Sequence, residues 1–175
     1  ISGYFPTPAP LAADVVRRAG IEPGHRVLEP SAGSGHIARA VRDAHPDSKL
    51  DTIEIAPKLQ AMLKEQGFDV VHHDHMDHQA DGEYDRIVMN PAFEKGQDMA
   101  QIRHAYSKLK PGGRLVSIMS EGPFFRSDRA SREFREWADG LGADHEKLPD
   151  GSFQSSDRQT GVATRMITIN KPHAA

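Results

Sequence analysis

The fold is decided by the stretch Val27-Leu28-Glu29-Pro30-Ser31-Ala32-Gly33-Ser34-Gly35-His36-Ile37-Ala38. It begins with a short apolar run that is typical of a buried strand, passes through a glycine-rich turn and continues as a helical pattern. Glycine lets the backbone approach a ligand closely, and open α/β sheets bind their ligands at the carboxyl ends of strands. The stretch therefore predicts a strand–turn–helix unit that holds a cofactor.

Two carboxylates narrow the choice of cofactor. Glu29 ends this strand, and Glu54 ends the next predicted strand, roughly 20 residues beyond Gly35, which suits an acceptor for ribose hydroxyls. Residues 33–38 also satisfy the G-x-G-x-x-A fingerprint of dinucleotide sites, but the Glu29 carboxylate would repel a pyrophosphate. A ligand with a ribose, an amine and no phosphate fits better, and S-adenosylmethionine has these properties.

The rest of the chain alternates short β-branched runs with helical patterns, which is typical of a parallel α/β sheet. We expect a Ser-, Gln- and Asp-rich loop at 150–160 to be mobile, and Pro111-Gly112-Gly113 to form a turn before the fifth strand. Helices are predicted over 8–19, 36–44, 57–66, 98–109 and 128–141, and strands over 26–30, 50–55, 69–73, 84–90, 114–120, 144–148 and 161–170.

Length and composition limit the number of domains and the kinds of partner and chemistry that this chain can have. The 175 residues predict a single domain over 1–175, in which residues 1–20 form an N-terminal segment and helix. A formal charge of −3 argues against a globally basic nucleic-acid clamp, although a local basic face stays open. The absence of cysteine excludes disulfides, thiolate metal sites and cysteine nucleophiles, and it fits a cytoplasmic protein. No apolar run reaches the ~18 residues of a membrane span, so we expect no membrane partner.

A second turn follows the predicted fourth strand, which ends in Asn90-Pro91-Ala92-Phe93. Asn-Pro after an apolar strand forms a rigid turn that presents one amide side chain at the carboxyl edge of the sheet. The aromatic ring three residues later can supply a flat stacking surface. By itself, such a tetrapeptide is more often an ordinary turn with a packing phenylalanine.

A histidine cluster at 71–78 satisfies the H-x-H-x-D-H zinc-ligand run of metallo-β-lactamase-like hydrolases through His73, His75, Asp77 and His78. Alternating residues on a strand end point the same way, so a metal pair is sterically reasonable there. Such a site needs further ligands from distant loops, and it leaves the glycine turn and the Asn-Pro turn unexplained. We therefore predict no functional metal and interpret the cluster as a polar loop around Asp74.

Basic residues gather between 100 and 135, Lys108 among them. Three arginines recur every three residues: Arg126, Arg129 and Arg132. On a helix they would lie along one flank, in a row that turns gradually around the helix axis. This row is a candidate contact for nucleic-acid phosphates near the Asn-Pro turn. The alternative is a solvated helix face, because acidic residues such as Glu133 interleave.

In this order, the motifs resemble those of class I S-adenosylmethionine-dependent methyltransferases of the amino-methylating, N6-adenine group, in the gamma arrangement. The resemblance implies a Rossmann-like, mostly parallel seven-stranded sheet with an antiparallel C-terminal strand and helices on both faces. The C-terminal segments 148–153 and 160–165 are similar to small adenine-methylase domains of phages and mobile elements. The matching segments are Phe5-Pro6-Thr7-Pro8, the glycine turn, Glu54, Asp74, Asn90-Pro91-Ala92-Phe93 and Leu109-Lys110-Pro111-Gly112-Gly113-Arg114.

The resemblance also implies a role for each matching residue. Thr7 and Pro8, with Phe5 packing nearby, would contact the methionine end of the cofactor. Glu29, Ser31 and the turn at Gly33 and Gly35 would hold its amino-acid moiety. Glu54 would accept from the ribose hydroxyls and Asp74 from the adenine amino group, and Asn90 would border the same site.

The catalytic assignment implied by the resemblance rests on Asn90, Pro91 and Phe93. The Asn90 side chain and the Pro91 carbonyl would accept hydrogen bonds from the target amine, and Phe93 would stack on an extruded base. The sequence departs from the family at Ala92, where a second proline is usual. It also departs at His75, where an aromatic residue often follows the acid.

These expectations predict methyl transfer to an exocyclic amine, adenine N6 in DNA being the first candidate and nucleic acid the expected partner. RNA guanine N2 and a protein glutamine amide are alternative acceptors, and a cofactor-binding but inactive partner subunit is an alternative of another class. Because the sheet occupies most of the chain after Asn90, sequence specificity is expected to be low or to come from a partner subunit or a missing segment.

Overall fold

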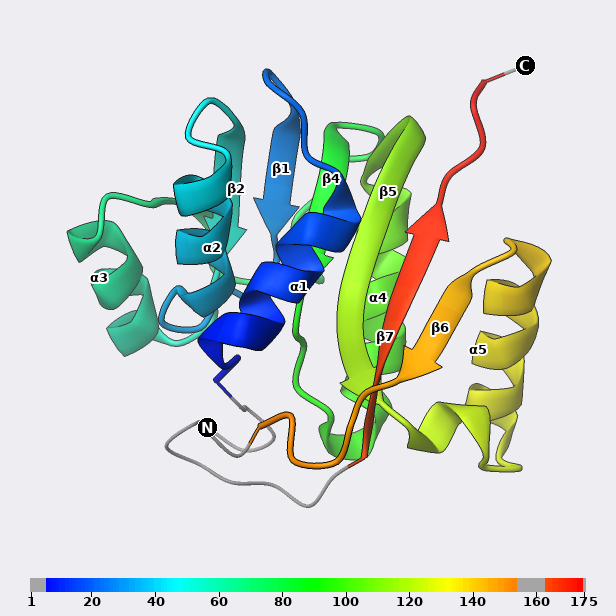
Figure 1. Ribbon diagram of the computed structural model, residues 1–175. Helices are drawn as coiled ribbons and strands as arrows, with labels where there is room; N and C mark the ends of the chain where they lie inside the picture. Colours follow the sequence, from blue (N-terminus) through cyan, green and yellow to red (C-terminus); the bar gives the residue numbers. More distant parts are fainter. Residues whose placement is uncertain (1–5, 154–162, 175) are drawn as a thin grey trace.

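The computed structural model describes residues 6–153 and 163–174 (Figure 1). The first half of this chain contains α1 (Ala9–Ala19), β1 (Arg26–Glu29), α2 (His36–Ala44), β2 (Lys49–Ile53), α3 (Pro57–Glu65), β3 (Asp69–His72) and β4 (Tyr84–Met89). The second half contains η1 (Glu94–Gly96), α4 (Gln97–Ser107), β5 (Leu109–Ser120), η2 (Gly122–Phe124), α5 (Arg129–Gly140), β6 (Asp144–Lys147) and β7 (Thr164–Asn170).

The seven strands form one sheet in the order β3-β2-β1-β4-β5-β7-β6. Strands β1 to β5 pair in parallel, and β7 runs antiparallel to both of its neighbours, β5 and β6. The predicted mostly parallel sheet with an antiparallel C-terminal strand is therefore confirmed. Figure 1 shows that the parallel strands all end at the same edge of the sheet, drawn at the bottom.

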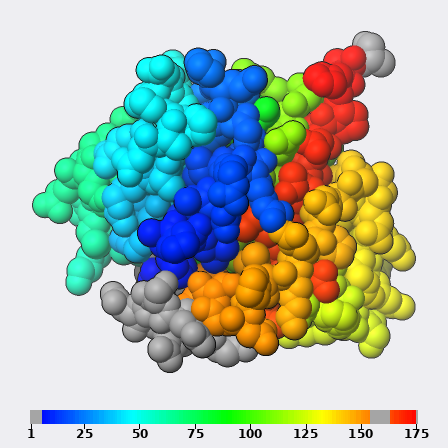
Figure 2. All heavy atoms as spheres, viewed as in Figure 1, coloured from blue at the N-terminus to red at the C-terminus, as the bar shows by residue number. Residues whose placement is uncertain are grey.

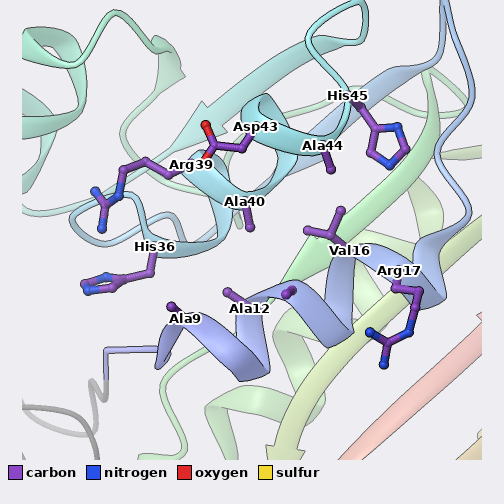
Figure 3. Close-up of a pocket in the computed structure, with 11 residues that line it drawn as sticks. Ala9, Ala12, Val16, Arg17, His36, Arg39, Ala40, Asp43, Ala44 and His45 are labelled. Atoms are coloured by element: carbon purple, nitrogen blue, oxygen red, sulfur yellow. The ribbon is translucent and has the colours of Figure 1, made fainter.

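Helices cover both faces of the sheet, which is also as predicted. Helices α1 and α2 lie on the face seen in Figure 2, and a hollow of about 660 Å³ between them is lined by alanines together with charged and histidine side chains. Figure 3 shows this hollow, and none of the site residues predicted from the sequence lines it. Among the described residues, no helix is long and apolar enough to cross a membrane.

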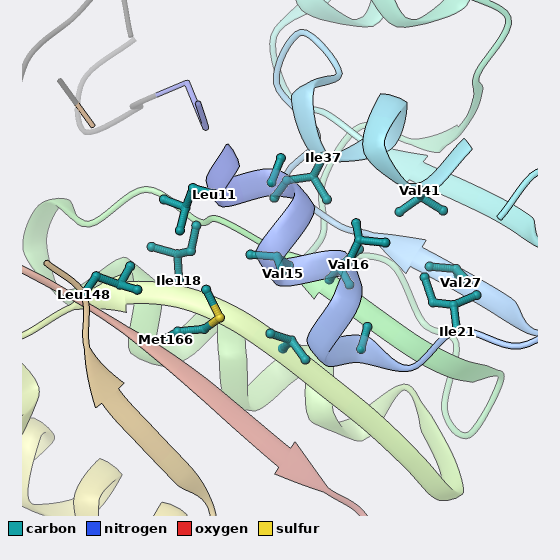
Figure 4. Close-up of a cluster of buried hydrophobic side chains, with 14 of the residues drawn as sticks. Leu11, Val15, Val16, Ile21, Val27, Ile37, Val41, Ile118, Leu148 and Met166 are labelled. Atoms are coloured by element: carbon teal, nitrogen blue, oxygen red, sulfur yellow. The ribbon is translucent and has the colours of Figure 1, made fainter. Parts of the chain in front are cut away.

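The core is divided by the sheet because successive strand residues point to opposite faces. Val27 and Val88 pack with α1 and α2 in the cluster drawn in Figure 4. Their neighbours Leu28 and Ile87 pack on the other face, with side chains of α4 and α5. All four are fully buried, as expected for a parallel sheet that is covered on both sides.

The element boundaries differ from the prediction most clearly at β5, which begins at Leu109 and includes the predicted Pro-Gly-Gly turn. The reason is tertiary pairing: the Gly112 N–H donates to the Lys171 carbonyl, and the Lys171 N–H donates to the Gly113 carbonyl. Gly112 has a φ of +82°, a value that glycine adopts without strain. Part of the predicted loop at 150–160 and the predicted start of the last strand lie outside the described residues.

One buried carboxylate fixes the distance between α4 and β5. Asp98, in the first turn of α4, accepts hydrogen bonds from the Ser120 N–H at 2.9 Å and the Ser120 hydroxyl at 2.7 Å. It also accepts from the Met99 N–H at 3.0 Å. Burial raises the pKa of Asp98, so the cost of burying its charge offsets part of the free energy that these hydrogen bonds contribute to folding. The bonds tie the helix that follows the Asn-Pro turn to the end of the neighbouring strand.

We expect Asp98→Ala to lower the free energy of unfolding by about 2–3 kcal/mol, because Ser120 would keep two donors without an acceptor. Asp128→Ala is the matched control: Asp128 also accepts from a serine at a helix start, but it is exposed, and its loss should cost about 1 kcal/mol. Urea denaturation at pH 7 measures both changes. Equal losses in the two variants would contradict the assigned role of Asp98.

Candidate cofactor and active site

A cavity of about 370 Å³ opens at the carboxyl edge of the parallel strands. Four residues predicted from the sequence line it together: Ser31 from the glycine turn, Glu54 after β2, Asp74 after β3 and Asn90 after β4. The structure therefore brings the ends of four neighbouring strands to one hollow. Further lining comes from Glu94, Gln97 and Gln101, which sequence reasoning missed.

Glu54 is held in place by two backbone amides. Its Oε1 accepts from the Gly33 N–H at 2.7 Å, and its Oε2 accepts from the Ala56 N–H at 2.9 Å. The side chain is 7 % exposed and lines the cavity. Because each carboxylate oxygen has a second lone pair, Glu54 can accept hydroxyl hydrogens in the cavity without losing these bonds.

The glycines of the turn shape the backbone without lining the cavity. Gly33 and Gly35 have φ values of +58° and +104°, in the region that favours glycine. A Cβ atom at Gly35 would lie 3.3 Å from a Leu63 methyl carbon, so this glycine also allows the turn to pack closely against α3. The turn presents Pro30 and Ser31 to the cavity instead.

Glu29 lies beside this turn with 1 % exposure. Burial raises its pKa well above the usual range, the negative charge of Glu54 adds to the rise, and a hydrogen bond with the Ala38 backbone opposes it. Glu29 Oε1 and the Ser31 hydroxyl are buried and have no hydrogen-bond partner within the described chain. Ser31 lines the cavity and Glu29 does not, so the Ser31 hydroxyl is the one of these two groups that meets a ligand there directly.

Asn90 connects the Asn-Pro turn to the N-terminal segment. Its Nδ2 donates to the Thr7 hydroxyl at 2.8 Å, and both side chains are buried. Thr7 and Pro8 stand at the start of α1, and neither lines the cavity. Since the amide nitrogen faces Thr7, the amide oxygen is the end that can accept a hydrogen bond from a donor in the cavity. Phe5 lies outside the described residues.

Phe93 is partly buried and packs against the core cluster that contains Leu11 and Phe153. It does not line the cavity, whereas its neighbours Ala92 and Glu94 do. Pro91 is buried. The turn therefore combines both interpretations given above: it presents Asn90 to the cavity, and it also packs a phenylalanine on the core.

The histidine cluster forms a compact loop after β3. Asp74 begins a turn, because its carbonyl accepts from the Asp77 and His78 amides and its Oδ1 accepts from the Met76 amide at 3.0 Å. Nowhere in residues 6–153 and 163–174 do three His, Asp or Glu side chains meet in a group that could hold a metal ion. His75 and His78 instead contact the buried Nζ of Lys108.

The predicted nucleic-acid contacts lie apart from the cavity. Arg126, Arg129 and Arg132 are exposed on the β5–α5 connection and on α5. Arg129 is 85 % exposed at its side chain and pairs with Glu133 at 2.9 Å. The connection begins directly after Ser120, which Asp98 ties to the start of α4.

Comparison with known proteins identifies the family to which this chain belongs. The methyltransferase domain family matches residues 7–156. Protein-L-isoaspartate O-methyltransferase of Methanopyrus kandleri is 33% identical over 104 residues, which are 54% of this chain and 44% of that protein. Trans-aconitate 2-methyltransferase of Mycobacterium tuberculosis is 28% identical over 112 residues, 63% of this chain and 42% of that protein. The chain thus spans less than half the length of these relatives.

Solved structures share the fold over nearly the whole chain. The modification subunit of a putative type I restriction enzyme from Vibrio vulnificus has a TM-score of 0.74 at 20% identity, covering 98% of this chain and 46% of that chain. TrmN from Thermus thermophilus has a TM-score of 0.66 at 22% identity, covering 93% of this chain and 48% of that chain. A 16S rRNA N2 G1207 methyltransferase from T. thermophilus, solved with AdoMet and guanosine, has a TM-score of 0.59 at 17% identity. The match covers 94% of this chain and 40% of that chain.

We expect Glu29→Gln to remove a loss of stability that the unsubstituted chain suffers as pH rises. Because the pKa of Glu29 is raised in the folded state, folding becomes less favourable as pH rises from about 4.5 toward that higher value. The variant cannot ionise at this position, so its advantage should appear at pH 7.5 and be smaller at pH 4.5. Thermal unfolding at the two pH values measures it, and an advantage that is the same at both would contradict the assignment.

Proposed function

We propose that this chain, which belongs to the class I S-adenosylmethionine-dependent methyltransferases, methylates an exocyclic amine, and that the amine is adenine N6 in DNA. Its cofactor is S-adenosylmethionine. The observation that carries the proposal is the hydrogen bond from Asn90 to Thr7 at the end of β4, beside the cavity lined by Glu54 and Asp74.

The cofactor supplies an electrophilic methyl group, so the protein has to position an acceptor and accommodate its charge. An exocyclic amine is a poor nucleophile because its lone pair is delocalised into the ring. Asn90 borders the cavity and would accept from one N–H group through its amide oxygen, and the resemblance assigns the second acceptor to the Pro91 carbonyl. Bonding both would favour a pyramidal nitrogen whose lone pair faces the methyl group, and no general base with a tuned pKa is needed.

The same two acceptors argue against a carboxylate as substrate. The names of the curated relatives point to acceptors that carry carboxyl groups. A carboxylate has no N–H to donate, and carbonyl oxygens at Asn90 and Pro91 would repel it. An amine donor satisfies both oxygens, and this favours N-methylation for the present chain.

DNA is favoured as the source of the amine by the shared fold with a restriction-enzyme modification subunit. RNA guanine N2 is the second candidate, because the likeness to the 16S rRNA N2 G1207 methyltransferase covers 94% of this chain. In either case the base would be extruded, and the partly exposed side of Phe93 would offer it a stacking surface. All described residues after Asn90 build the sheet and its covering layers, so we place sequence specificity outside the described residues, in a partner subunit or another segment of the protein.

We expect Asn90→Ala to reduce methyl transfer about 100-fold or more while the dissociation constant for S-adenosylmethionine changes little. Tritiated methyl transfer to unmethylated DNA, RNA and protein measures activity, and calorimetry measures binding. Asn170→Ala is the matched control, since Asn170 also ends a strand but is exposed on β7. Label in RNA or protein but not in DNA would overturn the DNA assignment. Tight cofactor binding without transfer to any acceptor would indicate an inactive partner subunit.

We expect the double substitution of Arg126 and Arg132 by Gln to weaken DNA binding and to lower its salt slope by about two, roughly one per lost phosphate contact. These two arginines are exposed, and Arg129 is left in place because it pairs with Glu133. Arg17→Gln, on an exposed site of α1, is the control and should leave the slope unchanged. Fluorescence anisotropy at 50–200 mM salt measures the slope, and an unchanged slope in the double variant indicates a merely solvated helix face.

A further inference from the structure

Lys108 is a fully buried lysine that the proposed methyl transfer does not use. It follows α4 directly and precedes β5, and its side chain is 0 % exposed. Its Nζ lies 2.7 Å from His75 Nδ1, 3.1 Å from the His75 carbonyl and 3.0 Å from His78 Nδ1. All three acceptors belong to the loop that follows β3, and no carboxylate of the described chain forms an ion pair with this ammonium group.

The hydrogen bonds of the lysine define the protonation of both rings. An ammonium group only donates, so Nδ1 of His75 and of His78 must accept, and each ring carries its proton on Nε2. His75 Nε2 then donates to the Gln101 carbonyl of α4 at 2.9 Å. Burial, followed by the charge of Lys108, lowers the pKa of His75 to about 3 and also lowers the pKa of His78. Both rings are therefore neutral at neutral pH.

The buried ammonium costs stability rather than supplying it. Burial lowers the pKa of Lys108 to about 8, against a weaker opposing effect of the Asp74 and Asp81 charges. The unfolded chain therefore binds more protons at this position between about pH 8 and 10.5, and folding becomes more favourable as pH rises through that window. Because burial of this ammonium group makes folding less favourable at neutral pH, stabilisation of the fold does not explain the contact.

The loop held by Lys108 is also a wall of the cofactor cavity. His73, Asp74, His75 and Met76 all line that cavity, whereas Lys108 itself does not. The lysine approaches from the side of α4, and its three donors match the three acceptors of the loop.

We infer that Lys108 is a positioning residue for the cofactor, whose ammonium group holds the loop at 73–78 in the shape that receives the adenine ring. The inference rests on the proposed placement of the adenine amino group at Asp74. It adds a residue that never touches the ligand and acts through His75 and His78.

Loss of one proton would leave the amine of Lys108 with two N–H groups for three acceptors, and its lone pair would face an acceptor. His75 and His78 are the imidazoles in direct contact with it, His104 of α4 lies edge-on to His75, and His72 lies against His78. Asp74 and Asp81 are the carboxylates that act on its charge. Adenine binding is therefore expected to weaken as pH rises through about 8.

The test uses Lys108→Met, which keeps an unbranched side chain close to the length of the lysine stem and removes the ammonium donors. Calorimetry with 5′-methylthioadenosine reports the adenine end alone, since this nucleoside has no group that titrates between pH 7 and 10. We expect its dissociation constant in the unsubstituted chain to rise about three- to tenfold from pH 7.5 to 9.5. Lys108→Met should bind weakly at both values, by about the same factor. It should unfold at about the temperature of the unsubstituted chain at pH 7.5, because removal of the buried charge offsets the cost of the acceptors left without a donor.

Lys110→Met is the matched control. Lys110 lies two residues further on, is 42 % exposed at its side chain and pairs with Asp85. This variant should bind the nucleoside with the affinity and pH dependence of the unsubstituted chain.

Three results would overturn the inference. The first is unchanged affinity in Lys108→Met, and the second is a loss of affinity that is matched by a fall in unfolding temperature. The third is a flat pH profile in the unsubstituted chain, which decides the question even if the variant does not fold. Failure of the unsubstituted chain to bind the nucleoside would overturn the adenine placement as well. Transfer to an acceptor other than DNA would correct the proposed function and leave this inference standing.

Discussion

The bond between Glu54 and the Gly33 amide is the contact on which the rest of the site depends. This bond joins the end of β2 to the glycine turn after β1. The second carboxylate oxygen of Glu54 accepts from the Ala56 amide and so fixes the start of α3. Burial and the nearby negative charge of Glu54 together raise the pKa of Glu29, so both disfavour the ionised form of that carboxyl group. A cationic cofactor entering there meets a site that can respond by releasing a proton.

A common arrangement is repeated around the cavity: each loop is held by a buried polar contact from a different element. Thr7 holds Asn90, and Lys108 holds the loop after β3. Asp98 performs the same task between α4 and the end of β5. Loops at the edge of a sheet have few apolar contacts of their own, so polar contacts of this kind set their geometry. The proposed methyl transfer would depend mainly on the position of the reacting groups, which loops held in this way can keep fixed.

The sequence allowed the fold class to be predicted because its strongest signals are local. The helix at 36–44 was predicted to the residue, since Gly35 marks its beginning and the apolar spacing marks its face. The predicted start of β5 was wrong because the strand continues through Pro-Gly-Gly as an irregular segment. The register against β4 shifts there, Gly112 keeps a φ of +82°, and pairing with Lys171 joins the segment to the rest of the strand. Lys108 was grouped with surface charges, the usual place for lysine, and nothing in its neighbours along the chain indicates burial. Gln97 and Gln101 were missed because their shared helix face gains meaning only beside the cavity.

The contact between Thr7 and Asn90 has a practical consequence for handling this protein. The chain ahead of α1 approaches the Asn-Pro turn, whereas the segment after β7 leaves from the opposite edge of the sheet, as Figure 1 shows. An affinity tag or fluorescent fusion joined ahead of Thr7 would lie near the edge of the sheet where the cavity opens. A fusion that continues the segment after β7 would extend away from the cavity, and immobilisation through that segment would leave the cavity facing solution.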